Sequence, residues 1–196
     1  PPGDRRPVRN EFSYQYGSSV DLIKATASSI NTAFVDLTSQ MDNGPRKIMK
    51  MAQAAGAPKG AGWDDNDRIP LGTAEVSPLD QASAYATFAN DGVSVPNHVV
   101  REVRDRRGKV IYEARPEKKR AVSENIAHDV THALSNVVEQ GTGRAVQTLD
   151  RPVAGKTGTK DRTNDDGSSD VVSAWFVAYT RQISTAVMYV AGNDGN

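Results

Sequence analysis

Apolar residues recur at helical spacing between Ser123 and Gly141. Every third or fourth position of this stretch is apolar, so these side chains share one stripe of a helix. They are Ile126, Val130, Leu134, Val137 and Val138. Ser123 is a typical N-cap residue, and Gly141 is typical of the position after a helix end. The pattern predicts a helix over about 123–140 with one buried face.

The first half of the chain carries shorter helical patterns. The segments are Asp21–Ala27, Ile30–Leu37, Pro45–Ala55 and a helix from Ser77 to about Ala89. Ser18 and Ser19 are candidate caps for the first of them. Proline at the first helical position and Gly56 after the last one define the third, and Ser77 caps the fourth. The region about 17–92 is therefore predicted to be mainly helical.

Strand patterns dominate the rest of the chain. Two of them, Val99–Val103 and Lys109–Tyr112, flank a turn at Arg107-Gly108, which predicts a β-hairpin over about 97–113. Three more crowd the C-terminal part, over about 152–191, with a polar, flexible loop at Thr163–Asp170 between two of them. These strands are Val153–Thr159, Val172–Tyr179 and Ile183–Val190. Helices followed by clustered strands with short connections predict an α+β fold with an antiparallel sheet.

Composition narrows the class of protein. The 196 residues have 24 basic and 24 acidic side chains, which argues against a nucleic-acid-binding protein. The basic stretch from Arg101 to Lys109 alternates with acidic residues, which is typical of a solvated hairpin. There is no cysteine, which excludes disulfides and thiolate metal sites. The hydrophobic share, 37%, is below average for a soluble domain, which suggests that part of the core comes from elsewhere.

Two short motifs carry the candidate chemistry. Ser29-Ile30-Asn31 lies at the predicted start of a helix, and Lys156-Thr157-Gly158-Thr159 lies on a predicted strand. Alone, the first is best interpreted as a helix cap with an early Asn, and the second also occurs by chance in unrelated strands. Their order, their separation of 127 positions and their settings together match two elements of the penicillin-binding proteins and serine β-lactamases.

These residue types suit peptide-bond acyl transfer, which needs a nucleophile, a base, a proton donor for the leaving amine and donors for the oxyanion. Lys156 supplies positive charge, which can attract a substrate carboxylate. Ser29 has a hydroxyl that can relay a proton. Asn31 has both a donor and an acceptor, so it can hold a substrate amide and a neighbouring lysine together. Gly158 lets an extended substrate lie against the strand.

The resemblance to class A penicillin-binding proteins extends beyond the motifs, from about Gly17 to Ala191. The segments that carry it are Ser28–Phe34, Leu71–Leu79, Ala84–Asn90, Val137–Gly143 and Ala174–Thr180. The resemblance implies catalytic roles for Ser29, Asn31 and Lys156. It also implies that Thr157, Gly158 and Thr159 bind substrate: the Thr159 backbone N–H forms half of the oxyanion hole, and the two threonine hydroxyls hold the substrate carboxylate.

The sequence departs from this family in one respect: it has no Ser-x-x-Lys. The nearest string is Thr157-Gly158-Thr159-Lys160. Both termini, 1–7 and 192–196, have the composition of loop interiors. We therefore expect residues 1–196 to be the C-terminal part of one transpeptidase domain. An upstream segment would supply the nucleophilic serine and further strands, and this chain would fold only together with it. Further upstream we expect a glycosyltransferase domain.

The resemblance implies a penicillin-recognising serine transpeptidase/β-lactamase-like fold, an antiparallel sheet with helices on both sides, here without its N-terminal part. The implied function is D,D-transpeptidation of peptidoglycan stem peptides that end in D-Ala-D-Ala, with β-lactams as covalent inhibitors and no cofactor. The implied location is the extracytoplasmic face of the bacterial membrane. An N-terminal helix absent from this chain would be the anchor, so the chain itself would not contact the membrane. A D,D-carboxypeptidase, a β-lactamase and a non-catalytic penicillin-binding sensor or scaffold remain alternatives.

Other candidate sites are weaker. His128 and His132 have the i, i+4 spacing of a zinc helix, but Asp129 stands beside them where a zinc protease has Glu, and no third ligand is evident. Both lie opposite the apolar stripe, so we interpret them as a solvated helix face. The acidic run Asp64–Asp67 lacks the glycine and the terminal glutamate of a calcium loop, and is interpreted as a surface turn. Trp63 and Trp175 are interpreted as packing residues.

Overall fold

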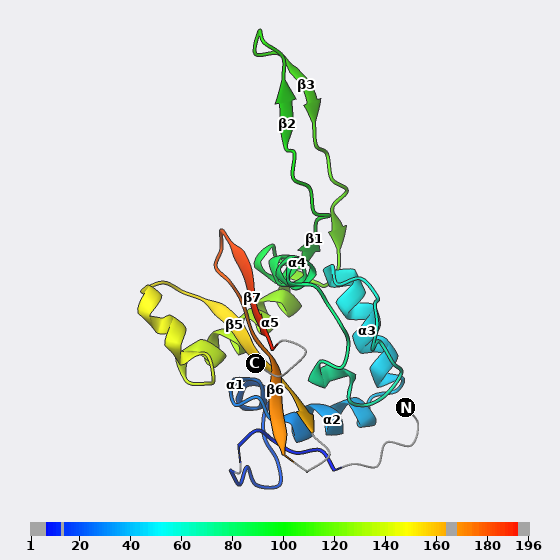
Figure 1. The fold of residues 1–196 in the computed structure, drawn as a ribbon, viewed down its shortest axis with the longest axis vertical. Coiled ribbons are helices and arrows are strands. Elements are labelled where there is room, and N and C mark those ends of the chain that lie inside the picture. Colours follow the sequence, from blue (N-terminus) through cyan, green and yellow to red (C-terminus); the bar gives the residue numbers. More distant parts are fainter. Residues whose placement is uncertain (1–6, 13, 164–167, 192–196) are drawn as a thin grey trace.

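The structure is a computed structural model that describes residues 7–12, 14–163 and 168–191 (Figure 1). The predicted terminal loops, apart from Pro7, and the centre of the predicted loop at Thr163–Asp170 lie outside the described residues. The helices are α1 (Leu22–Ala27), α2 (Asn31–Gln40), α3 (Gly44–Ala55), α4 (Pro78–Ala89) and α5 (Glu124–Glu139), with 3-10 turns η1 (Ile69–Leu71) and η2 (Arg144–Leu149). All five predicted helices are confirmed.

Local capping explains where most of these helices begin. The Ser77 hydroxyl accepts a hydrogen bond from the Asp80 backbone N–H at 3.1 Å, and Ser123 accepts one from Ile126 at 3.3 Å. The cap of α1 differs from the prediction. It is the Asp21 carboxylate, which accepts from the Lys24 backbone N–H at 2.7 Å, and neither Ser18 nor Ser19 caps the helix.

The strands are β1 (Val93–Ser94), β2 (Glu102–Arg104), β3 (Val110–Glu113), β4 (Lys119–Arg120), β5 (Ala154–Thr163), β6 (Ser169–Tyr179) and β7 (Ser184–Val190). The predicted hairpin and the three predicted C-terminal strands are present, and the structure adds a short antiparallel pair, β1 with β4, that the sequence did not predict. The three C-terminal strands form an antiparallel sheet in the order β5-β6-β7, with Lys156 opposite Val177 and Trp175 opposite Met188. The α+β class and the antiparallel sheet are confirmed.

One face of the sheet is covered by α4 and α5. Leu134 of α5 packs with Ala154 and Tyr179 of the sheet, and the partly buried residues around them come from α4 and α5, namely Tyr85, Phe88, Ala89 and Val130. Of the predicted stripe on α5, only Ile126 departs, being 50% exposed. On the opposite face of the sheet, Val187 and Tyr189 are 53% and 80% exposed.

Two further packing regions complete the body. Ala55, Ala57, Trp63 and Ala84 form a second buried cluster, and the Trp63 indole N–H donates to the Glu75 carbonyl oxygen at 3.2 Å. This confirms the interpretation of Trp63 as a packing residue. Helix α1 packs against α5, where Ala25, Ala27, Ala127 and Val137 are fully buried or nearly so. This packing fixes the end of α1 beside the sheet.

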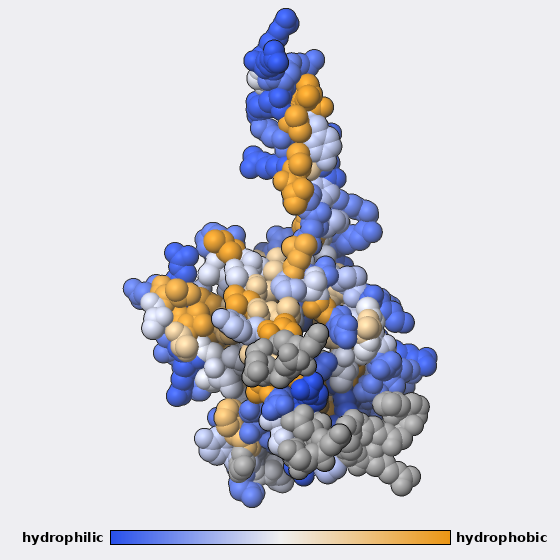
Figure 2. Space-filling model, viewed as in Figure 1, coloured by the Kyte–Doolittle hydropathy of each residue, from blue (hydrophilic) through white to orange (hydrophobic). Residues whose placement is uncertain are grey.

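The predicted hairpin is a long arm of β2 and β3 that projects from the body (Figure 1). Its ion pairs are local, such as Arg104 with Glu102 at 2.6 Å. Hydrophobic side chains follow one visible face of the arm (Figure 2), and the exposed ones include Val99, Val100, Val103, Val110 and Ile111. The prediction of a solvated hairpin did not include this apolar stripe.

Candidate active site

Ser29, the residue after the C-cap of α1, has a backbone conformation that favours glycine. Its φ is 53°, its N–H donates to the Thr26 carbonyl oxygen at 3.2 Å, and the N–H of Ile30 donates to the Ala25 carbonyl oxygen at 2.9 Å. These two bonds define a Schellman motif, in which the residue after the C-cap is left-handed and usually glycine. Ser29 therefore has a strained backbone, and its hydroxyl lies just beyond the C-terminal end of α1.

The predicted Ser-x-Asn segment thus bridges two helices. The prediction placed Ser29 at the start of a helix, but it follows α1, and Asn31 is the first residue of α2. Ile30 between them is 1% exposed, so it anchors the connection in the core. Ser29 and Asn31 on either side of Ile30 are only partly buried, so both polar side chains remain available outside the core.

An earlier segment of the chain covers the start of α2. The Asn31 side-chain amide donates to the Arg9 carbonyl oxygen at 2.9 Å, and Asn10 accepts from the Thr32 backbone N–H at 3.0 Å. The side chain of Asn10 therefore caps α2. The N-cap residue of this helix, Ile30, has no side-chain acceptor. The structure places the Asn31 amide group on Arg9. Within the described part of the chain, no hydrogen bond joins it to Lys156.

Lys156 on β5 meets Ser29 directly. Its Nζ donates to the Ser29 Oγ at 2.8 Å and to the Thr157 carbonyl oxygen at 3.0 Å. Burial lowers the pKa of Lys156 to about 8, because a charged ammonium group is costly away from water. Near neutral pH such a lysine can both hold and release a proton. The two predicted motifs are therefore joined by an ammonium–hydroxyl hydrogen bond.

The remaining residues of the second motif follow Lys156 along β5. Within the described sheet, β5 pairs only with β6, so its other edge is free to receive an extended peptide. The Thr157 Oγ1 lies 2.6 Å from the Thr142 Oγ1, a contact that the sequence reasoning did not find. Gly158 lies opposite Trp175, and Thr159 is exposed. The structure thus brings Ser29, Lys156 and Thr157 together at one strand edge.

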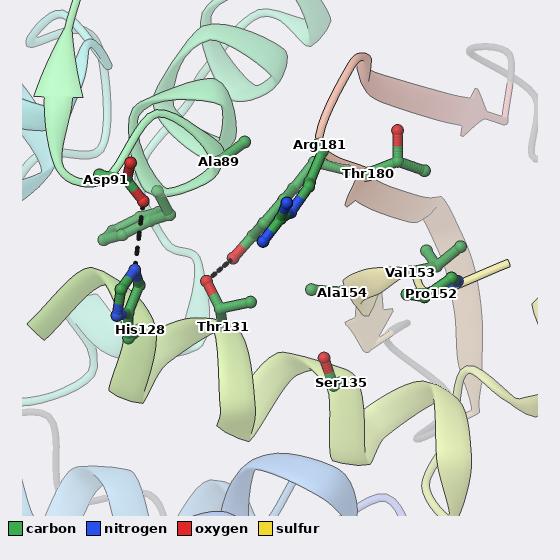
Figure 3. A pocket seen from close by; sticks show the side chains of 12 residues that line it. Ala89, Asp91, His128, Thr131, Ser135, Pro152, Val153, Ala154, Thr180 and Arg181 are labelled. Carbon is green, nitrogen blue, oxygen red and sulfur yellow. Dashed lines mark hydrogen bonds and ion pairs between the residues drawn. The ribbon is translucent and has the colours of Figure 1, made fainter. Parts of the chain in front are cut away.

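A separate cavity of about 220 Å³ lies between α4, α5 and the beginning of β5 (Figure 3). Among its lining residues, Thr131 bonds the Tyr179 hydroxyl at 2.8 Å, and Arg181 also lines it. Burial raises the pKa of Tyr179, and that of Tyr85 beside it to about 12. None of the predicted site residues lines this cavity.

The histidines on α5 behave as surface residues. Among the described residues, the metal-binding side chains that come within reach of one another are Asp91, Glu124 and His128, and all three are exposed. His132, which the zinc spacing pairs with His128, is not part of this group. His128 instead lies within hydrogen-bond distance of Asp91, at 3.2 Å, on the surface. Across the described ranges, no helix is long and apolar enough to span a bilayer.

Comparison with known proteins decides the family. The family model for the penicillin-binding protein transpeptidase domain matches residues 4–196. The chain belongs to this family. It is 34% identical over 183 residues to penicillin-binding protein 1A of Aquifex aeolicus, and 30% identical over 193 residues to penicillin-binding protein 1B of Haemophilus influenzae. These matches cover 91% and 94% of the chain, and confirm the resemblance to class A penicillin-binding proteins.

The chain spans only 23% and 22% of the length of these two relatives. It is therefore similar to one part of much longer proteins. Among solved structures, PonA1 of Mycobacterium tuberculosis is similar with a TM-score of 0.74 and 28% identity, over 88% of this chain and 48% of that one. PonA1 in complex with penicillin V gives a TM-score of 0.70 at the same identity, over 89% and 48%. The transpeptidase fold is confirmed.

Proposed function

We propose that this chain supplies the Ser-x-Asn and Lys-Thr-Gly motifs of a serine-type D,D-transpeptidase that cross-links peptidoglycan stem peptides ending in D-Ala-D-Ala. The observation that carries this proposal is the 2.8 Å contact between Lys156 Nζ and Ser29 Oγ, two groups separated by 127 positions in the sequence. It rests also on membership of the transpeptidase family and on the complex of PonA1 with penicillin V.

The nucleophile of the proposed reaction is a serine in a segment of the protein outside residues 1–196. Its oxygen attacks the carbonyl carbon of the penultimate D-Ala while the lysine of the same Ser-x-x-Lys motif takes its proton, and the terminal peptide bond breaks. The departing D-Ala nitrogen needs a proton, which the Ser29 hydroxyl delivers. Lys156 bonds that hydroxyl and, with a pKa of about 8, can replace its proton near neutral pH. The amine of a second stem peptide then attacks the ester, and the serine is released.

Substrate binding uses the free edge of β5. The extended stem peptide lies along Gly158, whose lack of a side chain permits close approach, and the backbone N–H of Thr159 faces the developing oxyanion. The hydroxyls of Thr157 and Thr159 and the charge of Lys156 hold the terminal carboxylate. Asn31 contacts the substrate amide through its carbonyl oxygen, since its amide nitrogen donates to Arg9.

The proposed setting follows from the same family. The complete protein would be anchored at the extracytoplasmic face of a bacterial membrane. The segment with the nucleophilic serine would pack against Ser29-Ile30-Asn31 and Lys156-Thr157-Gly158. A β-lactam would acylate that serine in place of the stem peptide.

Fluorescent penicillin tests the proposal on the full-length protein. Stable covalent label that is lost in Lys156→Ala is the expected result, because the lysine acts in acylation. A matched control is Lys160→Ala, four positions along β5, which should label normally. Rapid release of the label to water would indicate a β-lactamase. Release of D-Ala from a stem peptide without cross-linking would indicate a carboxypeptidase, and stable labelling without any reaction on stem peptides would indicate a non-catalytic penicillin-binding sensor or scaffold.

A further inference from the structure

The loop Gly141-Thr142-Gly143, which follows α5, contacts both sides of the Ser29–Lys156 pair. The backbone N–H of Thr142 donates to the carbonyl oxygen of Ala27 at 3.1 Å, two residues before Ser29. The Thr142 hydroxyl lies 2.6 Å from that of Thr157, the residue after Lys156. One residue therefore links the end of α1 to β5.

The fit of this loop against α1 requires glycine at position 141. A Cβ added to Gly141 would lie 2.1 Å from the Ala27 carbonyl oxygen and 2.8 Å from its carbonyl carbon, far inside van der Waals contact. The loop is also tied back to α5, since the N–H groups of Gly141 and Gly143 both donate to the Val137 carbonyl oxygen, at 3.1 and 2.9 Å. Because Ala27 and Val137 are fully buried or nearly so, this arrangement is rigid.

A bound carboxylate would decide which of the two threonine hydroxyls, Thr142 or Thr157, donates the hydrogen bond between them. Each threonine hydroxyl has one proton to donate, and a carboxylate can only accept. If Thr157 donates to the substrate carboxylate, the bond between the two threonines must run from Thr142 to Thr157. A chain of two hydrogen bonds then ends on the carboxylate, and such chains strengthen their members.

We propose that Thr142 is a positioning residue for carboxylate recognition: it donates to Thr157, which donates to the substrate, while its backbone holds the end of α1 beside β5. Thr142 does not touch the substrate. This inference rests on the proposed function and adds to it a residue outside the two motifs.

Acylation of the full-length protein by penicillin G and by its methyl ester tests the inference. Thr142→Val removes the hydroxyl but keeps the side-chain shape, and should slow acylation by penicillin G about tenfold, the loss typical of a hydrogen bond in a charged chain. The methyl ester has no carboxylate, so its acylation, although slow in the wild type, should fall much less. Thr142→Ser keeps the hydroxyl and should stay within about threefold of the wild type.

A matched control is Thr148→Val on η2, whose hydroxyl donates to the Ala145 carbonyl oxygen at 3.2 Å, away from β5. It should acylate normally. Three results would each overturn the inference. Thr142→Val could lose as much activity with the ester as with penicillin G, or could acylate at the wild-type rate. Alternatively, Thr142→Ser could be as slow as Thr142→Val. If Thr142→Val does not fold, Thr142→Ser decides: rates within threefold support the proposal, and a tenfold loss in a folded protein contradicts it.

Lys156→Ala separates this inference from the function on which it rests. If Lys156→Ala acylates normally, the proposed function fails. If Lys156→Ala is inactive while Thr142→Val behaves as the wild type, the function stands and only the role of Thr142 is wrong.

Discussion

Because the backbone of Ser29 is left-handed, two substitutions of Ser29 should reduce activity equally but differ in their effect on stability. Ser29→Ala and Ser29→Gly both remove the hydroxyl that Lys156 contacts, so each loses the same hydrogen bond. They differ in the cost of a φ of 53°, which is about 1–2 kcal/mol for alanine and close to zero for glycine, and in chain entropy, of which glycine loses about 0.5–1 kcal/mol more on folding. In the full-length protein, Ser29→Gly should therefore be about 1 kcal/mol more stable than Ser29→Ala.

Thermal unfolding measures the difference. For a domain of 150–250 residues 1 kcal/mol corresponds to roughly 2–4 °C in Tm, so the complete, larger domain should show about 2 °C or less. Both variants should acylate with fluorescent penicillin about 100-fold or more slower than the wild type, since general acid catalysis is lost in each. Ser28 is the control position, because its φ of −93° suits any residue, and Ser28→Gly should be less stable than Ser28→Ala. If Ser29→Ala is as stable as Ser29→Gly, the backbone of Ser29 is not strained and this reasoning is refuted.

Three further predictions concern Lys156 and Asn31 in the full-length protein. Lys156→Ala should slow β-lactam acylation by ~100- to 1,000-fold while the protein stays folded, as judged by circular dichroism; near-wild-type acylation would show that the site is wrongly assigned. Asn31→Ala should impair acylation with a Tm within a few degrees of the parent. A large loss of Tm with normal acylation would mean that Asn31 only begins α2. The pKa of Lys156 is about 8 in the fold and 10.5 in the unfolded chain. Between pH 8 and 10 the unfolded chain thus binds more protons, so the free energy of unfolding should rise with pH. Lys156→Met should lack this rise, and parallel pH profiles would contradict the burial of Lys156. Above pH 10 the raised pKa of Tyr85 opposes the effect, because the folded tyrosine keeps its proton.

The sequence predicted most elements because their signals are local. Ser77 and Ser123 cap helices, and the apolar stripe of α5 packs as its spacing indicates. Ile126 is the exception within that stripe, since it lies in the first turn of α5, outside the cluster formed with the sheet. Asp21 caps α1 in place of the predicted Ser18 or Ser19, because backbone geometry decides which of several adjacent capping residues acts.

The candidate site was only partly predictable. Motif order and spacing indicated that Ser29 and Lys156 meet, but no local rule places serine at a left-handed position that glycine favours. The contacts of Asn10 with Thr32 and of Thr142 with Thr157 join distant segments, so no local pattern contains them. Gly141-Thr142-Gly143 was visible as a segment shared with the family. Its position between the two motifs could come only from the packing of α1 against α5.

Mapping the acylated residue tests the central claim most directly. The full-length protein is acylated with penicillin, digested, and its adduct located by mass spectrometry, with Lys156→Ala as the comparison. The account predicts that the adduct lies on a serine outside residues 1–196 and is strongly reduced in Lys156→Ala. A stable adduct on Ser29, or on any other residue of this chain, would contradict it.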